Sequence, residues 1–291
     1  MINGSLEDRF TNFKITYLHY SNIFIINRLL CRNGTPPLTW SQRACIGEGM
    51  AKALNYIHTL KGKPLVHGDV KSANVLLDAQ FECKLGDFGL AQQISANKSG
   101  NTTHITVTSV HGTSVYLPPE YLRSRILSPA VDVYSYGIVM LEMATGLRAF
   151  DGKSLLIEKV KDEIVSCNNK KLNLISRLRD KRMTLDNTIF PWFLFLIKLG
   201  LMCAQLRKSS RPKMIQLLDY YAQLKDREEC QKSKLQSTSS QENKVSERRL
   251  KIICDITNKD KSGVPYTFYD DNKEKLANYL AQEIAVFVAG N

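Results

Sequence analysis

Residues 131–145 constrain the fold more than any other part of this sequence. They read VDVYSYGIVMLEMAT and are almost wholly apolar. A helix that is apolar on every side is buried on every side, so the rest of the chain has to surround it. Gly146 follows directly, and glycine is the usual residue for ending a helix in the left-handed conformation. The sequence therefore predicts a central buried helix that ends at Gly146.

Two further regions carry helical patterns. Apolar residues in 38–60 recur at helical spacing, among them Ile46, Met50 and Leu54. Residues 192–224 hold two more helical patterns, one on each side of Arg211 and Pro212. The apolar run 189–203 is too short to span a bilayer and includes Lys198, so it favours a buried helix and no transmembrane segment.

Residues 65–90 change to the pattern of short strands. The segments 75–77 and 81–85 are short enough to be strands and are separated by a turn-like 78–80, which predicts a β-hairpin. Residues 92–110 are rich in Ser, Thr and Asn and predict a long exposed loop. Residues 225–262 are polar and predict a disordered linker, and 263–291 can form one amphipathic helix.

Charge and cysteine content limit the classes of partner. The chain of 291 residues has 40 Lys and Arg against 28 Asp and Glu, a net charge of +12. Half of this excess lies in the polar stretch 207–251, so we expect a solvated tail and no nucleic-acid partner. The seven cysteines are scattered without a CxxC pair, which argues against disulfides and zinc and for a reducing, cytoplasmic location.

One constellation of polar residues points to phosphoryl transfer. The sequence HGDVKSAN occupies residues 67–74, and Asp87, Phe88 and Gly89 follow after the predicted hairpin. Phosphoryl transfer needs a carboxylate that accepts the proton of the attacking hydroxyl, oxygen ligands for Mg²⁺ and a cation near the phosphoryl group. Asp69, Asn74 with Asp87, and Lys71 supply these three roles, and the hairpin would bring both metal ligands to one edge.

These segments resemble a eukaryotic protein kinase. HGDVKSANVLLD followed by GDFGLA resembles its catalytic loop and metal-binding loop. GTSVYLPPE at 112–120 resembles the end of the activation segment, DVYSYG at 132–137 the start of the central helix, and Arg211 the last conserved subdomain. NGSLEDR, LTWSQR, the HGD form and VYLPPEY are similar to the Pelle/IRAK group of Ser/Thr kinases, which act in Toll and interleukin-1 receptor signalling.

The resemblance implies ATP and Mg²⁺ as cofactors and assigns roles by position. Asp69 would be the catalytic base, and Lys71 would contact the γ-phosphate of ATP. The implied cofactor-binding residues are Met1, Lys71, Asn74, Leu76 and Asp87, of which Asn74 and Asp87 would bind the metal and Leu76 would lie beneath adenine. The implied supporting contacts are a His67–Phe88 stack, a buried Glu120–Arg211 ion pair, Asp132 capping the catalytic loop, and Thr113 on Asp69.

The expected fold is mainly α (α+β), a protein-kinase-like C-terminal lobe with a short β-hairpin region. No GxGxxG precedes His67, so we expect the N-terminal β lobe to be missing. Residues 1–224 would then form a partial kinase domain, the hinge plus the C-terminal lobe. Residues 10–27 interrupt the family pattern, as a translated intron or as a family-specific insertion.

Two functions therefore remain open. The first is an ATP-dependent Pelle/IRAK-type Ser/Thr kinase in Toll-like innate immune or developmental signalling. The resemblance implies protein substrates, death-domain-type adaptor complexes and recruitment to receptors at the plasma membrane. The second is a truncated, catalytically inactive lobe that acts as a binding module, or an incomplete gene model.

Overall fold

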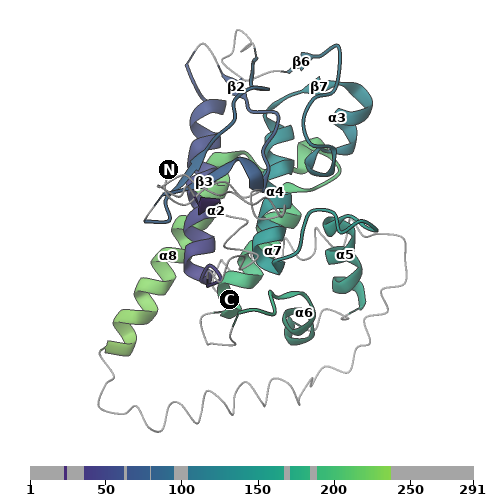
Figure 1. Cartoon of the computed structure of the whole chain (residues 1–291). Coiled ribbons are helices and arrows are strands. Elements are labelled where there is room, and N and C mark those ends of the chain that lie inside the picture. The colour runs from purple at the N-terminus through teal and green to yellow at the C-terminus, as the bar shows by residue number, and fades with distance from the viewer. Residues whose placement is uncertain are drawn as a thin grey trace, which may run out of the picture. The chain divides into compact units, whose positions relative to one another are not determined.

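A computed structural model describes residues 23–24, 36–61, 64–78, 80–94, 104–166, 171–183 and 189–236 (Figure 1). The chain divides into two compact units between Asp219 and Tyr220. Helix α8, Met214–Gln236, begins in the first unit and continues in the second. The description below concerns the first unit, which is mostly helical with small sheets. None of the helices in the described ranges is both long and apolar enough to cross a membrane.

Helix α4, Pro129–Thr145, is the centre of the first unit. All of its residues from Val131 to Thr145 are buried, and Gly146 ends it with φ 67°. Helix α7, Ile189–Cys203, packs along α4. The close approach depends on Gly137, where a Cβ would come 2.7 Å from the Cβ of Cys203. The prediction of a central buried helix with a glycine cap is confirmed.

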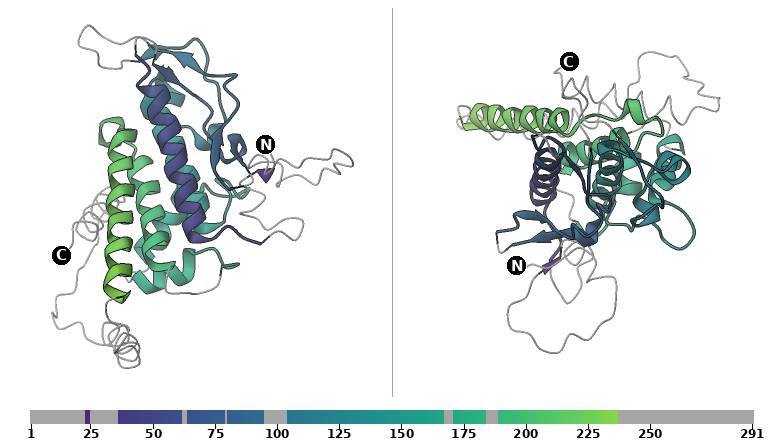
Figure 2. Two further views of the ribbon diagram at one scale, coloured as in Figure 1. Left: turned by 90° about the vertical axis from the view of Figure 1, so that its left-hand side faces the viewer. Right: turned by 90° about the horizontal axis from the view of Figure 1, so that it is seen from above.

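Helix α2, Trp40–His58, lies beside α4 and α7 (Figure 2). It begins with a capping box, in which the Thr39 hydroxyl accepts from the Gln42 N–H and the Gln42 side chain accepts from the Thr39 N–H. Ile46, Met50 and Leu54 are fully buried, so the predicted helical spacing in 38–60 is confirmed.

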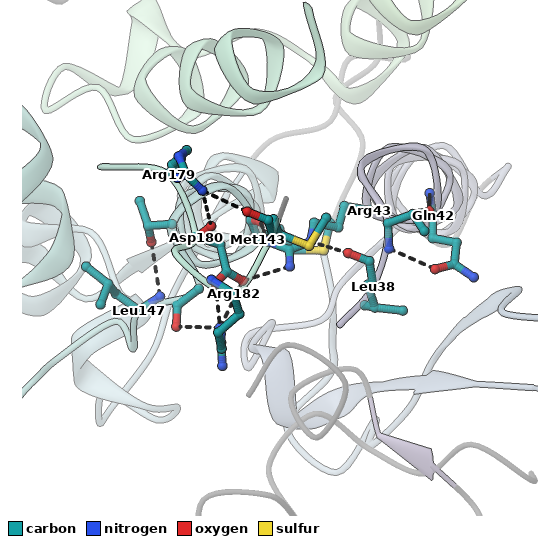
Figure 3. Close-up of polar contacts among 12 residues, drawn as sticks. Leu38, Gln42, Arg43, Met143, Leu147, Arg179, Asp180 and Arg182 are labelled. Carbon is teal, nitrogen blue, oxygen red and sulfur yellow. Dashed lines mark hydrogen bonds and ion pairs between the residues drawn. The ribbon is translucent and has the colours of Figure 1, made fainter. Parts of the chain in front are cut away.

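A buried arginine joins three segments next to this core (Figure 3). The Arg43 guanidinium donates to the carbonyls of Leu38, at 2.9 Å, and Met143, at 2.6 Å. It also donates to the Asp180 carboxylate at 2.7 Å, and both side chains are almost completely buried. Arg182 donates to the same carboxylate from the other side. This network connects the start of α2, the end of α4 and the segment after α6, Lys171–Leu178.

The predicted hairpin is present as β3, Val75–Leu77, and β4, Cys83–Leu85, which pair antiparallel. Strand β1, Ile23–Phe24, pairs with the other edge of β3. These two residues lie in the atypical stretch 10–27, so part of that stretch supplies a strand to this sheet. The rest of 10–27 lies outside the described residues.

The prediction of one long exposed loop over 92–110 is wrong at both ends. Strand β5, Gln92–Gln93, pairs with β2, Leu65–Val66, and β6, Ile105–Thr106, pairs with β7, Ile126–Leu127. The loop composition is real, but the apolar residues between the polar ones find partners far away in the sequence. From this segment, Ile94, Ile105, Val107 and Val110 join a buried hydrophobic cluster. The other members of the cluster are Val66, Leu117, Tyr121, Leu127 and Val131.

Short elements complete the described chain. They are α3, Pro119–Ser124, α5, Leu156–Ser166, and the 3₁₀ turns η2, Ser72–Asn74, η3, Ser114–Tyr116, and η4, Lys208–Ser210. Helix α8 runs to Gln236 and so extends into the predicted linker 225–262. Residues 225–236 contain no glycine or proline and are mostly good helix formers, which polarity alone conceals. The remainder of the predicted linker and residues 263–291 lie outside the described residues.

Candidate active site

Asp69 is the centre of a cluster of polar side chains at the end of β2. It is 7% exposed. Its Oδ1 accepts hydrogen bonds from the backbone N–H and the hydroxyl of Thr113, each at 2.9 Å. Its Oδ2 lies 2.7 Å from the Lys71 ammonium, which also donates to the Thr113 hydroxyl at 3.0 Å. The expected contact between Thr113 and Asp69 is therefore confirmed.

These contacts keep Asp69 ionised. Burial by itself would raise the pKa of this carboxyl, but the hydrogen bonds from Lys71 and Thr113 and the charge of Lys71 oppose it. The net result is a pKa below the ordinary value of an aspartate. Asp69 therefore presents a fixed carboxylate, with one oxygen held by Thr113 and the other by a cation.

Asn74 and Asp87 lie at the two ends of the β3–β4 hairpin. The Asn74 amide nitrogen donates to the Asp69 carbonyl at 2.8 Å and to its Oδ2 at 3.2 Å, so the amide oxygen is the atom that a cation could bind. The Gly86 N–H donates to the Asn74 carbonyl at 2.8 Å, which places the two loops next to each other. Asp87 is exposed and has φ 57°, a left-handed conformation that is uncommon outside glycine and is enriched at functional sites.

The donor set at this edge fits Mg²⁺ bound together with a nucleotide. Mg²⁺ takes oxygen ligands, keeps several waters and is typically held by one or two protein groups plus phosphate oxygens. Asn74 and Asp87 offer an amide oxygen and a carboxylate. Among the described residues, no group of three or more His, Cys, Asp or Glu could hold a metal by itself. Two protein ligands, with phosphate oxygens and waters as the others, are the set that Mg²⁺ takes beside a nucleotide.

Two predicted nucleotide contacts are less defined. Leu76 lies in the middle of β3 and is partly buried. A Cβ at position 86 would come 3.1 Å from the Leu76 Cδ1. Because Gly86 has no side chain, the surface next to Leu76 stays uncovered. Met1 lies outside the described residues.

Asp132 of α4 holds the backbone of the catalytic loop, as expected. It accepts from the N–H of His67 at 2.8 Å and of Gly68 at 2.9 Å. His58, the last residue of α2, contacts the same carboxylate through Nε2 at 2.8 Å, a partner that the sequence analysis missed. A histidine at the end of a buried helix face was its only sequence signal. Gly68 has φ 78°, a conformation that favours glycine at this position.

The other two expected supporting contacts are also present. The rings of His67 and Phe88 meet edge-on with centroids 4.8 Å apart, and Phe88 is 45% exposed. Arg211 donates to both carboxylate oxygens of Glu120, at 2.6 and 2.9 Å. The Arg211 side chain is buried, but that of Glu120 is 30% exposed, so the ion pair is only partly buried and not fully buried as expected. This ion pair ties α3, at the end of the activation segment, to the turn before α8.

A second polar group was missed altogether. Tyr116 of η3 contacts Ser72 of the catalytic loop and Glu142 of α4, and all three side chains are buried. The only sequence signal was Glu142 itself, the one acidic residue besides Asp132 in the apolar segment 131–145, because a buried carboxyl needs hydrogen-bond partners.

Comparison with known proteins shows which family this arrangement belongs to. The model of the protein kinase domain matches residues 17–263. The chain belongs to the protein kinase family. The segments that place Asp69, Asn74, Asp87 and Glu120 around α4 are therefore parts of a kinase domain, and the resemblance inferred from the sequence is confirmed.

The relatives of this kinase domain include Pelle-like serine/threonine kinases. The Pelle-like serine/threonine-protein kinase pik-1 of Caenorhabditis elegans is 36% identical over 216 residues, 71% of this chain and 44% of the relative. The serine/threonine-protein kinase pelle of Drosophila melanogaster is 38% identical over 189 residues, 63% of this chain and 36% of the relative. An L-type lectin-domain containing receptor kinase of Arabidopsis thaliana is 37% identical over 200 residues, 67% of this chain and 28% of the relative.

These matches support a protein serine/threonine kinase of Pelle-like type. The match with this chain spans less than half of the length of each of these relatives. The family match begins at residue 17 and ends at residue 263. It therefore does not confirm the prediction that only the C-terminal lobe is represented, and it extends past residue 224, the predicted end of the domain.

Proposed function

We propose that this chain carries the phosphotransfer centre of a Pelle-type kinase that moves the γ-phosphate of ATP to Ser or Thr hydroxyls of proteins. The observation that carries the proposal is Asp69, a buried carboxylate held by Thr113 and Lys71 beside the amide of Asn74. Phosphoryl transfer depends mainly on positioning and on electrostatic stabilisation, and this cluster supplies both.

Each side chain has a distinct task in this proposal. Asp69 orients the attacking hydroxyl and accepts its proton as the bond to phosphorus forms. Lys71 places its positive charge beside the oxygens of the phosphoryl group that is transferred. Asn74 and Asp87 would hold Mg²⁺, which when bound neutralises charge on the phosphates. Thr113 forms hydrogen bonds with both Asp69 and Lys71 and so fixes their relative positions.

Leu76, with Met1, would form part of the adenine site, since Leu76 lies on the sheet that ends at Asn74. The class of substrate and the pathway rest on the resemblance. We propose protein substrates, adaptors of the death-domain type and a role in Toll-like signalling, with recruitment to receptor complexes at the plasma membrane. The similarity to Pelle-like kinases supports this, and pull-down of adaptor proteins with the tagged chain would test it.

The direct test is Asp69→Asn. Asn keeps the size of the side chain but cannot accept a proton, so kcat should fall by at least about 10²-fold in protein that is still folded by far-UV circular dichroism. Asp151→Asn is the matched control, because this exposed carboxylate contacts its own turn at Lys153 and Ser154. Retained activity in Asp69→Asn would disprove the role given to Asp69.

A second candidate is a kinase lobe that binds partners without catalysing transfer. The sequence left this alternative open, since residues 1–66 contain no GxGxxG motif of the kind that covers the phosphates in protein kinases. The two candidates differ in nucleotide binding. A melting temperature that rises by several degrees with Mg²⁺ and ATP supports the enzyme, and no rise supports the binding lobe.

A further inference from the structure

A chain of buried hydrogen bonds connects the catalytic loop to helix α4. The Tyr116 hydroxyl lies 2.9 Å from the Ser72 Oγ and donates to the Glu142 Oε1 at 2.9 Å. The exposed fractions of Ser72, Tyr116 and Glu142 are 1%, 8% and 2%. Tyr116 uses its one proton toward Glu142, so the Ser72 hydroxyl has its single proton for Tyr116 or for the Glu142 carboxyl, whose pKa it also lowers. These contacts therefore link the catalytic loop to the carboxyl group of Glu142.

The two oxygens of the Glu142 carboxyl group differ in their hydrogen bonds. Its Oε1 also accepts from the backbone N–H of Ala149 at 2.8 Å. Its Oε2 is buried and has no hydrogen-bond partner among the described residues. Burial raises the pKa of Glu142 to about 7, against the opposing effects of the Ala149 N–H, the hydroxyls of Tyr116 and Ser72, and the charge of Arg148. The group is thus poised between its two protonation states near neutral pH.

The position of Ser72 affects the turn that lies between Lys71 and Asn74. It is the first residue of turn η2, which ends at Asn74, and its carbonyl accepts from the N–H that follows the turn. The turn is closed from the other side by the Asn74 N–H, which donates to the Lys71 carbonyl at 2.9 Å. Holding Ser72 therefore holds the spacing between Lys71 and Asn74, the two side chains that flank Asp69.

A further hydrogen bond holds Tyr116 in addition to those from Ser72 and to Glu142. The Ser135 hydroxyl of α4 donates to the Tyr116 carbonyl at 2.8 Å. Three residues earlier in the same segment, Thr113 holds Asp69. The segment around Tyr116 thus reaches the catalytic loop at two points, Asp69 and Ser72.

We propose that Glu142 and Tyr116 are positioning residues that hold Ser72, and that loss of the proton from Glu142 strengthens the hydrogen bonds by which they hold the catalytic loop. The inference rests on the proposed phosphotransfer function and deepens it by adding a regulation of the same site. None of the three side chains is proposed to touch the substrate.

The direction of the effect follows from hydrogen-bond strength. A carboxylate accepts a stronger and shorter hydrogen bond from a hydroxyl than a neutral carboxyl group does. When Glu142 loses its proton to solvent, its bond from Tyr116 strengthens, and Tyr116 polarised in this way becomes a better acceptor for Ser72. The charged or titratable groups that act on Glu142 are Tyr116 from η3 and Arg148 from the segment after α4. The catalytic rate should therefore rise as the pH passes through the titration of Glu142.

The first test observes the carboxyl group directly and needs no activity. The chain is labelled with ¹³C at the glutamate carboxyl carbons, and Glu142→Gln identifies the resonance by its loss. We expect a titration midpoint near pH 7 and an upward shift of about one unit or more in Tyr116→Phe, which removes a donor to the charged form. Ser72→Ala should shift it upward by less. A midpoint in the ordinary glutamate range, or one that Tyr116→Phe leaves unchanged, overturns the proposal.

The second test measures kcat between pH 5.5 and 8.5 at saturating ATP and protein substrate. The wild type should gain activity across neutral pH, and Glu142→Gln should lose that inflection while the KM values stay within about twofold. Glu163→Gln is the matched control, because this carboxylate makes an exposed ion pair with Arg177. An active wild type whose profile is unchanged in Glu142→Gln overturns the positioning role. An inactive wild type rejects the proposed function instead, and the carboxyl titration still decides whether the three residues are coupled.

Discussion

Asp180→Asn is the most informative perturbation of the fold. Asp180 accepts from Arg43 at 2.7 Å and from the Arg182 Nε at 2.8 Å and Nη2 at 2.9 Å. The Arg43 side chain is 0% exposed and that of Asp180 is 2% exposed. Asn has nearly the same volume as Asp, so the substitution changes the charge and one acceptor without opening a cavity. It removes the carboxylate charge that faces the buried Arg43 guanidinium.

The structure sets the expected magnitude. Removing one partner of a buried ion pair typically costs 3–5 kcal/mol of unfolding free energy. Arg43 keeps its bonds to the carbonyls of Leu38 and Met143, and the Asn oxygen can still accept one bond. The loss should therefore lie near the lower end, about 3 kcal/mol. Because domains of this size are stable by about 5–15 kcal/mol, the variant loses a fifth to more than half of its stability.

The assay is urea unfolding followed by far-UV circular dichroism. Glu163→Gln is again the control, since its ion pair with Arg177 joins side chains that are 32% and 54% exposed. That change should cost no more than about 1 kcal/mol. The double variant Arg43→Met with Asp180→Asn removes the stranded charge and should recover part of the loss. If Asp180→Asn costs no more than the surface control, then the buried pair does not stabilise the fold as argued.

Two further predictions concern acid and packing. Burial by itself would raise the pKa of Asp180, but hydrogen bonds and charge from Arg182 and Arg43 lower it, so its stabilising effect is present above about pH 4 and is lost as the pH falls toward the lowered value. Urea midpoints measured from pH 6 down to pH 3 should fall less steeply in Asp180→Asn than in the wild type, and equal slopes would contradict this. Gly137→Ala should destabilise by roughly 1–3 kcal/mol, because the new Cβ would come 2.7 Å from the Cys203 Cβ. A calorimetric melting temperature equal to that of the wild type would show that α7 can move away at little cost.

Local sequence patterns predicted the elements that are long or strongly periodic. The apolar segment that became α4 and the spacing that became α2 needed no information from elsewhere in the chain. The strands in 92–110 could not be predicted in this way, because each is two residues long and exists only through its partner. Leu65–Val66 and Ile126–Leu127 supply those partners. Helix formation in 225–236 was missed because polarity was given more weight than helix propensity.

The sequence alone determined the chemistry that is available at the candidate site. One hairpin and its flanking loops contain Asp69, Lys71, Asn74 and Asp87, so short-range geometry is enough to bring them together. The residue types and the family they indicate can therefore be read from one sequence.

Only the tertiary structure decided which buried charges and hydroxyl groups meet. Arg43 and Asp180 are 137 positions apart, and Ser72 and Tyr116 are 44 apart. A sequence shows that a buried arginine or glutamate needs a partner, because an unpaired polar group in the core is costly. It does not show which partner, because that depends on how helices and loops far apart in the chain pack around α4.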